Sequence, residues 1–512
     1  MPSTLPALPT PLPSVEVVDR ARGGPAAVVV RPGEEAEPLV LGPGSAGISG
    51  EWIAAMGLTG KAGEVHIGPV GATARWVVGI GTGTGAKWRT AGSALVRAVH
   101  TRMAADEEAG RAVDRTLSVL LPQDAGPDEV RELVRAVRLG GYQFKVASAA
   151  AKPRLRTIRL VVPAGRVAEL TEVARRAAAL AEATALTRDL ANTPSNVKDP
   201  AWLSRMATRA AAGVRGLKVE VRDERWLAEQ GFGGMLAVGG GSASPPRLIE
   251  LSWRPRGAAP HLILVGKGIT FDTGGISVKK AEGMHLMRTD MAGGAAVIAA
   301  LVAVARFGLG VRVTGLVACA ENHMSGSAYR PGDVVRHFGG RTTEVTNTDA
   351  EGRMVLADAL AYATARLRPD VLVDVATLTG GMKVSLGTRT GGVFSNTDEL
   401  ADRVRAAGDL AGEAWWRMPL PGDVDSLAAE LIDAVPSDIA DVRQCPPGPS
   451  SITAAAFLRE FTAGLPWAHL DIAGPARAEK PYDDVVPGAT GFAARTLIEL
   501  VSSYASAART DS

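Results

Sequence analysis

The sequence predicts an α/β protein with two domains: a smaller N-terminal α/β domain and a larger C-terminal α/β domain whose central mixed sheet is flanked by helices. Three observations predict this. The 512 residues exceed what one core usually holds. A composition of 46% hydrophobic and 21% charged residues is typical of globular proteins. Short apolar runs alternate with helical runs along the chain, a pattern that favours a sheet covered on both faces.

Charge and cysteine content exclude several classes of protein. The net charge of +2 is too small to favour binding to nucleic acid or a membrane surface. The two cysteines, Cys319 and Cys445, are too few for a disulfide framework and suit a reducing cytoplasm. Residues 1–14 are rich in Pro, Leu and Thr, and they lack the basic start and apolar run of a signal peptide. We therefore expect a disordered tail there, no membrane span and a cytoplasmic protein.

Residues 15–165 are predicted to form the N-terminal domain. The loop Gly79–Gly85 is rich in glycine, but its spacing does not match a dinucleotide-binding motif, and we interpret it as a turn. The predicted strands are Trp76–Ile80, Thr116–Leu121 and Thr157–Val162, and the predicted helices are Ala91–Ala104 and Asp128–Leu139.

Residues 166–191 are predicted to be a linker helix, because Val167–Leu190 has helical periodicity and contains no Pro or Gly. Asn192–Asn196 then breaks the helix and opens the second domain, residues 192–512. Its predicted strands are Leu217–Val221, Arg247–Ser252, Leu262–Val265, Arg312–Ala318, Val371–Val375 and Ala468–Ile472. Its clearest helical runs are Ala292–Phe307, Met354–Leu367 and Thr453–Phe461.

Four carboxylates gather in the glycine-rich stretch between Leu264 and Arg353. Asp272 follows Lys267 after the strand that ends at Val265, and Asp290 stands just before a helix. Asp349 and Glu351 are two residues apart, so in an extended segment they would face the same side. Four such groups repel one another unless cations are present. Oxygen ligands of this kind suit Mg²⁺, Mn²⁺ or Zn²⁺, and two ions roughly 3.5–4 Å apart can share a water molecule.

Each of these residues also has an ordinary structural interpretation. Asp272 and Asp290 could cap turns or helices. Glu351 could be a first-turn acid that favours the helix dipole. Lys267 and Lys279 could be solvated surface lysines. Spacing and chemistry alone leave a metal site and these interpretations open.

Two segments resemble the signatures of the leucyl aminopeptidase (cytosol aminopeptidase) family. The first, Gly266–Lys279, reads GKGITFDTGGISVK, and the second, Asn347–Arg353, reads NTDAEGR. The resemblance covers about residues 185 to 500, and the N-terminal region matches only in outline. It continues through Glu321-Asn322, Tyr329–Val334, Asp374–Gly380, Ser437–Asp441, Trp467–Gly474 and Gly488–Gly491.

The resemblance implies two metal ions, Zn²⁺ with Mn²⁺ or Mg²⁺ able to replace one of them. One ion would be held by Lys267, Asp272, Asp290 and Glu351, and the other by Asp272, Asp349 and Glu351. Asp272 and Glu351 would therefore bridge the ions. A lysine amine can be a ligand only when it is neutral, and a nearby metal favours loss of its proton.

The resemblance also implies hydrolysis of peptides at a free N-terminus, by attack of a metal-bridging water on the carbonyl. Lys279 would stabilise the oxyanion. Arg353 would hold a bicarbonate ion that acts as general base. Main-chain groups of Thr377, Leu378 and Gly380 would position the substrate, and Met287 would line the first specificity pocket. The family further implies a homohexamer.

The sequence departs from the family pattern at several places, which puts substrate preference in doubt and leaves the metal chemistry intact. Lys280 stands where Pro is common, and Arg288 where Lys is common. His323-Met324 replaces the usual Met-Pro after Glu-Asn, and the segment Cys445–Ser450 is unusually rich in proline. His285 could be taken for a further ligand, although the resemblance already supplies every ligand.

Two alternative functions remain open at this stage. Some relatives bind DNA as architectural or regulatory proteins, but Arg131, Arg135 and Arg138 alternate with acids, as on a solvated helix face. Another two-metal hydrolase, such as a phosphoesterase, could use the same ligands. The match at Asn347–Arg353 argues against that second alternative.

Overall fold

The structure is a computed structural model that describes residues 8–33, 39–147, 152–257, 260–420 and 435–510. The first compact unit holds the described residues up to Ala185 and Glu479–Pro487, and the second holds the remainder. The predicted domain limits stay a prediction, because a division into two compact units does not show which segment folds independently. The first seven residues of the predicted disordered tail lie outside the described residues, and its last residue, Ser14, begins β1.

Unit 1 is built around a mostly parallel sheet in the order β1-β7-β6-β2-β5-β4, with β3 paired to β2. Its strands are β1 (Ser14–Val18), β2 (Ala26–Pro32), β3 (Leu39–Leu41), β4 (Val65–Ile67), β5 (Trp76–Gly79), β6 (Thr116–Leu120) and β7 (Thr157–Val161). Its helices are α1 (Gly50–Met56), α2 (Gly85–Glu108), α3 (Pro127–Leu139) and the short 3-10 helix η1 (Ala164–Arg166). All strands and helices predicted for this region are confirmed, and the loop between β5 and α2 is the predicted turn.

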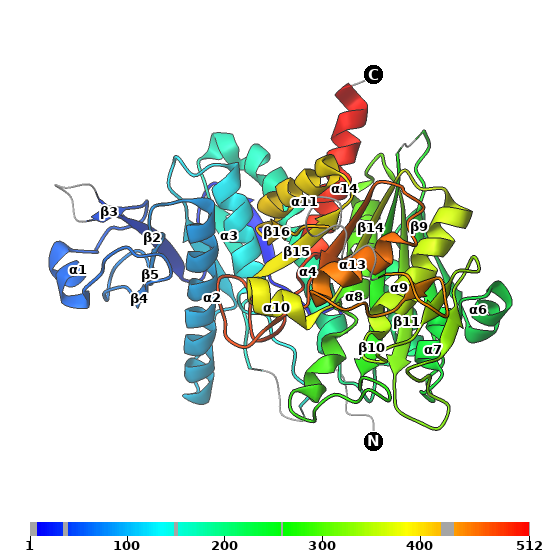
Figure 1. Cartoon of the computed structure of the whole chain (residues 1–512). Helices are drawn as coiled ribbons and strands as arrows, with labels where there is room; N and C mark the ends of the chain where they lie inside the picture. Colours follow the sequence, from blue (N-terminus) through cyan, green and yellow to red (C-terminus); the bar gives the residue numbers. More distant parts are fainter. Residues whose placement is uncertain (1–7, 34–38, 148–151, 258–259, 421–434, 511–512) are drawn as a thin grey trace. The chain divides into compact units, whose positions relative to one another are not determined.

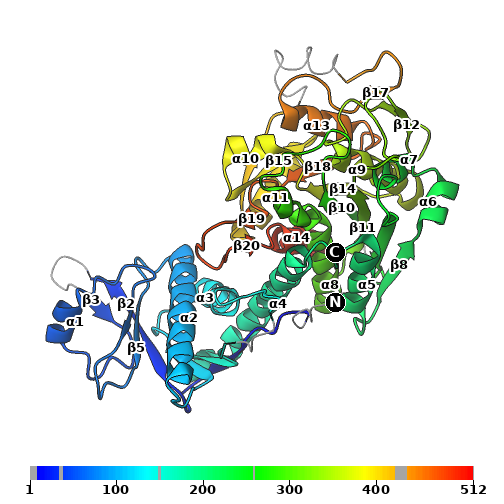
Figure 2. The same cartoon turned by 90° about the horizontal axis from the view of Figure 1, so that it is seen from below.

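Alternate residues of β2 pack on opposite faces of this sheet, as the two-residue period of a strand requires. Ala27 and Val29 belong to a core shared with α2 and α3, whereas Val28 and Val30 belong to a smaller core. Trp52 of α1 packs against that smaller core. In Figures 1 and 2, α1 accordingly lies on one side of β2 and β5, and α2 and α3 lie on the other.

Unit 2 contains an eight-stranded sheet in the order β16-β15-β18-β14-β10-β11-β9-β8. Its strands are β8 (Leu217–Arg222), β9 (Arg247–Trp253), β10 (His261–Asp272), β11 (Arg312–Asn322), β14 (Val371–Ala376), β15 (Thr390–Ser395), β16 (Ala414–Arg417) and β18 (Trp467–Asp471). Smaller sheets contain β12 (Val334–Arg336), β13 (Thr342–Glu344), β17 (Val442–Arg443), β19 (Arg477–Ala478) and β20 (Gly488–Ala489).

The helices described from Val167 onward include every helical run predicted for the linker and the second domain, and α4 begins in unit 1 and ends in unit 2. They are α4 (Val167–Asn192), α5 (Pro200–Ala211), α6 (Glu224–Gln230), α7 (Gly233–Gly239), α8 (Ala292–Phe307), α9 (Glu351–Tyr362), α10 (Gly380–Leu386), α11 (Asp398–Ala411), α13 (Ser450–Arg459) and α14 (Ala494–Thr510). Short 3-10 and π segments are η2 (Met284–Thr289) and η3 (Ala363–Leu367).

The large sheet is mixed, which confirms the predicted fold class. Strand β10 pairs in parallel with β11 and β14, and β14 pairs in parallel with β18. Strands β9 and β15 run antiparallel to their neighbours β11 and β18. Figure 2 shows β10 and β14 between α8 and α5 on one side and α9 and α13 on the other.

Helix α8 lies so close to β10 that the contact requires glycine. All its residues from Ala292 to Ala305 are buried. A Cβ atom added to Gly266 of β10 would lie 2.5 Å from the Cα of Gly294 in α8. By length and composition the stretch Met284–Phe307 could cross a membrane, but 89% of its most apolar window is buried inside the structure. It therefore has the burial of a core helix.

Two predicted strand ends are wrong. The strand predicted to end at Ala318 is β11, which continues to Asn322. The larger error concerns β10. The sequence placed the end of this strand at Val265, before Lys267 and Asp272, because glycines follow the apolar run. In the structure β10 continues to Asp272, and its register with β11 shifts between Ile269 and Asp272. Both functional candidates therefore stand on a rigid strand of the sheet.

We predict that Gly266→Ala lowers the free energy of unfolding by about 1–3 kcal/mol, because the added methyl group overpacks the contact with α8. Gly310→Ala is the matched control, since nothing lies within 4 Å of a Cβ atom at Gly310. Urea unfolding of both variants is the measurement. Equal stability of the two variants would show that this close approach does not constrain the fold.

Candidate active site

The site lies at the carboxyl ends of four parallel strands, where α/β sheets commonly place their ligands. Asp272 ends β10, Asn322 ends β11 and Asp471 ends β18. Thr377 directly follows β14. Because these strands are neighbours in the sheet, side chains from distant parts of the sequence come into contact there.

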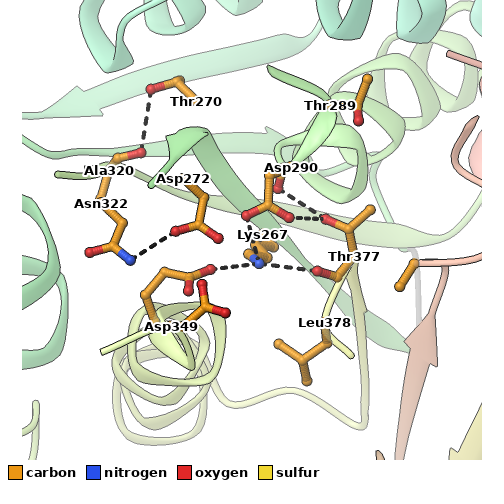
Figure 3. Close-up of polar contacts among 12 residues, drawn as sticks. Lys267, Thr270, Asp272, Thr289, Asp290, Ala320, Asn322, Asp349, Thr377 and Leu378 are labelled. Atoms are coloured by element: carbon orange, nitrogen blue, oxygen red, sulfur yellow. Dashed lines mark hydrogen bonds and ion pairs between the residues drawn. The ribbon is translucent and has the colours of Figure 1, made fainter. Parts of the chain in front are cut away.

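Lys267 is the centre of this cluster. Its ammonium group lies 2.8 Å from Oδ2 of Asp290 and 2.7 Å from Oε1 of Glu351. It also donates a hydrogen bond of 3.1 Å to the carbonyl oxygen of Thr377. Figure 3 shows this amine pointing into the group of acids. Only 2% of the Lys267 surface is exposed, so its charge depends on these partners.

The stem of Lys267 passes the first turn of α9 at a glycine. A Cβ atom added to Gly352 would lie 2.6 Å from Cε of Lys267 and 2.9 Å from Cδ1 of Leu378. No larger residue fits there without moving the lysine or the loop after β14. Glycine at this position therefore lets the helix that carries Glu351 approach the strand that carries Lys267.

Asp272 is held by the strand beside it. The register pairs Asp272 with Asn322, and the Asn322 amide donates to Oδ1 of Asp272 at 2.8 Å and to the carbonyl oxygen of Thr348 at 2.9 Å. The backbone N–H of Gly274 donates to the same Oδ1 at 2.9 Å. One carboxylate oxygen is thus fixed, while Oδ2 lies 2.8 Å from the ammonium group of Lys279.

Lys279 and Asp349 form the outer part of the cluster. The Lys279 ammonium group pairs with Oδ1 of Asp349 as well as with Asp272. Asp349 lies in a turn, and Glu351 is the first residue of α9. The extended segment considered from the sequence is therefore wrong. The two acids instead approach the cluster from a turn and from a helix start.

Burial and crowding shift the pKa values of these acids upward. Burial, followed by the charge of Asp272, raises the pKa of Glu351. Burial also raises the pKa of Asp290, and Lys267 opposes it only in part. Burial lowers the pKa of Lys267, but the surrounding carboxylates, Asp290 first, outweigh burial and raise it. Burial and neighbouring carboxylates together make all three groups hold their protons more strongly than free side chains do.

The cluster fits divalent metal ions. Among the described residues, Asp272, Asp290 and Glu351 each offer a carboxylate oxygen within 4.8 Å of the others, and all three are buried. Oε2 of Glu351 is buried without a hydrogen-bond partner in the described part of the chain. The acids outnumber the two lysines that pair with them. An oxygen-rich site with excess negative charge suits hard divalent cations.

The loop after β14 is fixed from two sides. The Thr377 hydroxyl donates to Oδ1 of Asp290 at 2.7 Å. The backbone N–H groups of Leu378 and Thr379 donate to Asp471 at 3.3 and 3.1 Å. The Thr377 carbonyl oxygen that accepts from Lys267 belongs to this loop, which also carries the predicted substrate-binding residues. These hydrogen bonds therefore hold both in place.

Arg353 is buried in the first turn of α9, beside the cluster. Its Nη1 donates to the carbonyl oxygen of Gln444 at 2.8 Å. Its Nε is buried without a hydrogen-bond partner among the described residues. Burial lowers the pKa of Arg353, but an arginine keeps its charge at any ordinary pH. A buried cation with an unused N–H group can bind an anion.

The remaining candidates lie around the cluster. Met287 is partly buried in η2, and Gly380 is exposed at the start of α10. The departures Lys280, His285 and His323 are all exposed. The group of candidate metal ligands found among the described residues does not include His285.

Comparison with known proteins identifies the family. A family model described as the cytosol aminopeptidase family, catalytic domain, matches residues 185–498, more than half of the chain. The chain belongs to the cytosol aminopeptidase family. It is accordingly a metal-dependent aminopeptidase, a metallo-exopeptidase that hydrolyses peptides.

Curated relatives of this cytosol aminopeptidase bear the same family name. A probable cytosol aminopeptidase of Streptomyces avermitilis is 41% identical over 94% of both chains. One of Streptomyces coelicolor is 50% identical, and that match spans 64% of this chain and 62% of the relative. A solved structure, the bottromycin maturation enzyme BotP in complex with Mn, has a TM-score of 0.80 and 37% identity. The match covers 96% of this chain and all of BotP.

Sequence reasoning missed several residues that support the site of this cytosol aminopeptidase. Asn322 and Asp471 occur in segments that carried the resemblance, but neither residue was predicted to have a role. In the structure both residues end strands, a position where α/β sheets commonly place ligands, but the sequence pattern put those strand ends at Ala318 and Ile472. Gln444 was not predicted either: its side-chain oxygen accepts from the backbone N–H groups of Thr346 and Asn347, and its backbone carbonyl accepts from Arg353.

We predict that Gly352→Ala weakens Mn²⁺ binding by about tenfold or more while the protein still folds, because the methyl group displaces Lys267. Mn²⁺ titration of chelated protein by calorimetry is the measurement. Gly50→Ala is the control, because α1 leaves open space around Gly50. Unchanged Mn²⁺ affinity in Gly352→Ala would contradict the role given to this close contact.

Proposed function

We propose that this enzyme removes N-terminal amino acids, leucine and similar residues by preference, from peptides by hydrolysis, with metal ions held by its carboxylate cluster that would activate the attacking water. The observation that carries the proposal is the buried group of Asp272, Asp290 and Glu351 around Lys267, within the segment that matches the family's catalytic domain. The ions are proposed to be Mn²⁺ or Zn²⁺, with Mg²⁺ able to occupy one site.

Lys267, Asp272, Asp290 and Glu351 would hold one ion. Asp272, Asp349 and Glu351 would hold the other. When bound, the ions lower the pKa of a water molecule and polarise the scissile carbonyl. Lys267 must lose its proton to act as a ligand, since an ammonium group has no free electron pair.

Two cations of the chain would act on the substrate and the proton. Lys279 lies at the open side of the cluster, and its charge would stabilise the oxyanion that forms on the carbonyl oxygen. Arg353 would hold bicarbonate, which when bound supplies a general base. The buried guanidinium group with an unused Nε supports this role, because its planar fork suits a carboxylate-like anion.

Substrate positioning is assigned to the loop after β14. Main-chain groups of Thr377, Leu378 and Gly380 would bind the dipeptide unit, and Met287 would line the pocket for the N-terminal side chain. The hydrogen bonds from this loop to Asp290 and Asp471 support the proposal, because they keep its backbone in one place.

Assembly, location and domain limits complete the proposal. We propose a homohexamer in the cytoplasm. The domains are proposed as residues 15–165, a linker helix at 166–191 and the catalytic domain at 192–512. The name of the relatives, probable cytosol aminopeptidase, supports the cytoplasmic location.

The primary test is hydrolysis of leucine p-nitroanilide. Chelated enzyme should be inactive and should regain activity with Mn²⁺, Zn²⁺ or Mg²⁺. Glu351→Gln should lose at least about 100-fold in kcat/KM, because it removes the proposed bridging charge. Glu282→Gln, at an exposed position two residues after Lys280, should remain active. Full activity of Glu351→Gln, or no activity with any metal across a panel of amino-acyl substrates, would refute the proposal.

A second test concerns Arg353. We expect Arg353→Met to lower kcat by about 100-fold, the usual contribution of a general base, while Mn²⁺ affinity stays within a few-fold. Bicarbonate added to depleted buffer should stimulate the unmodified enzyme and leave Arg353→Met unchanged. Arg330→Met, at an exposed site, is the control. Bicarbonate stimulation that persists in Arg353→Met would place the anion elsewhere.

A further inference from the structure

Lys198 is a fully buried lysine outside the proposed ligand set. It follows the segment that ends α4, and its side chain is enclosed by three backbone carbonyl groups. Its ammonium nitrogen donates to the carbonyl oxygens of Leu190 at 3.0 Å and Ala191 at 2.9 Å, and also to that of Arg288. The sulfur of Met291 lies 3.6 Å away. Its exposed surface is 0%.

The three acceptors require three N–H donors, which only the protonated amine supplies. Burial, followed by the charge of Arg288, lowers the pKa of Lys198. Among the described residues no ion pair links Lys198 to a carboxylate, so its positive charge is stabilised by the dipoles of the carbonyl groups. Burying a cation without a counterion costs free energy, and a residue buried in this way usually has a specific role.

The carbonyl groups that Lys198 joins come from two separate segments. Leu190 and Ala191 stand in the last turn of α4, where helix carbonyl groups lack partners within the helix. Arg288 belongs to η2, two residues before Asp290. The backbone N–H of Asp290 in turn donates to the carbonyl oxygen of Met287 at 3.1 Å. Lys198 therefore fixes the short segment that delivers the Asp290 carboxylate.

We propose that Lys198 is a positioning residue for the metal centre, which ties η2 to the end of α4 and so sets the place of Asp290. This inference rests on the proposed function, because it takes Asp290 as a metal ligand. A lysine that only capped α4 would need the carbonyl groups of Leu190 and Ala191. The third bond, to Arg288, connects it to the site.

The test measures Mn²⁺ binding to chelated protein by calorimetry, together with the thermal midpoint and with kcat and KM for leucine p-nitroanilide. Lys198→Met removes all three donors at similar length. Lys198→Gln keeps two N–H donors, so it can be measured if Lys198→Met does not fold. Lys218→Met, at an exposed lysine of β8, is the matched control, and Asp290→Asn reports on the ligand itself.

We expect Lys198→Met to weaken Mn²⁺ binding by about 10- to 100-fold, as loss of a supporting contact to a metal ligand does. Lys198→Gln should lose less, and Lys218→Met nothing. At saturating Mn²⁺ the folded Lys198→Met should recover most of its kcat. A lower thermal midpoint with unchanged Mn²⁺ affinity would reduce Lys198 to a structural role and overturn the proposal.

The two proposals fail in different ways. If Asp290→Asn binds Mn²⁺ as tightly as the unmodified enzyme, the proposed ligand set fails, and this inference fails with it. If Asp290→Asn loses affinity and Lys198→Met does not, only the role of Lys198 is overturned. If Lys198→Met does not fold, Lys198→Gln decides, and unmodified affinity in that variant overturns the proposal.

Discussion

The buried ion pairs of Lys267 with Asp290 and Glu351 are the interaction on which the rest of the site depends. Charges removed from water are stable only when partners and hydrogen bonds replace the solvent. Here the acids exceed the lysines, so the chain alone does not neutralise the cluster. A protein that keeps such a group buried is built for added cations, which fits a metal-dependent aminopeptidase.

The central sheet is the rigid support that holds these buried charges in place. Strand β10 is paired on both edges by parallel strands, and helices cover both faces, so Lys267 and Asp272 project from a rigid support. Single residues then fix the segments that arrive from elsewhere: Asn322 holds Asp272, Asp471 holds the loop after β14, and Gln444 holds the turn before α9. Asn322 binds only one carboxylate oxygen of Asp272, and Asp471 and Gln444 bind backbone N–H groups. The other carboxylate oxygen of Asp272 therefore stays available to ligands.

Much of the fold and most of the cluster could be predicted from the sequence. The apolar runs of β10, β11 and β14 are continuous because parallel strands are buried on both faces. Motif resemblance supplied the acids and Lys267. The extension of β10 to Asp272 could not be predicted, because glycines usually end a strand pattern and here they serve close contacts with α8 and β11. The role of Lys198 could not be predicted either, because its partners are backbone carbonyl groups, which every residue has.

The measurement that tests this account most directly is anomalous X-ray diffraction at the manganese edge from crystals grown with Mn²⁺. The account predicts two manganese peaks within the carboxylate cluster, both in contact with Asp272 and Glu351, with Lys267 no longer paired to Glu351 as an ammonium ion. A structure that keeps the Lys267–Glu351 ion pair intact, with manganese bound elsewhere, would contradict it.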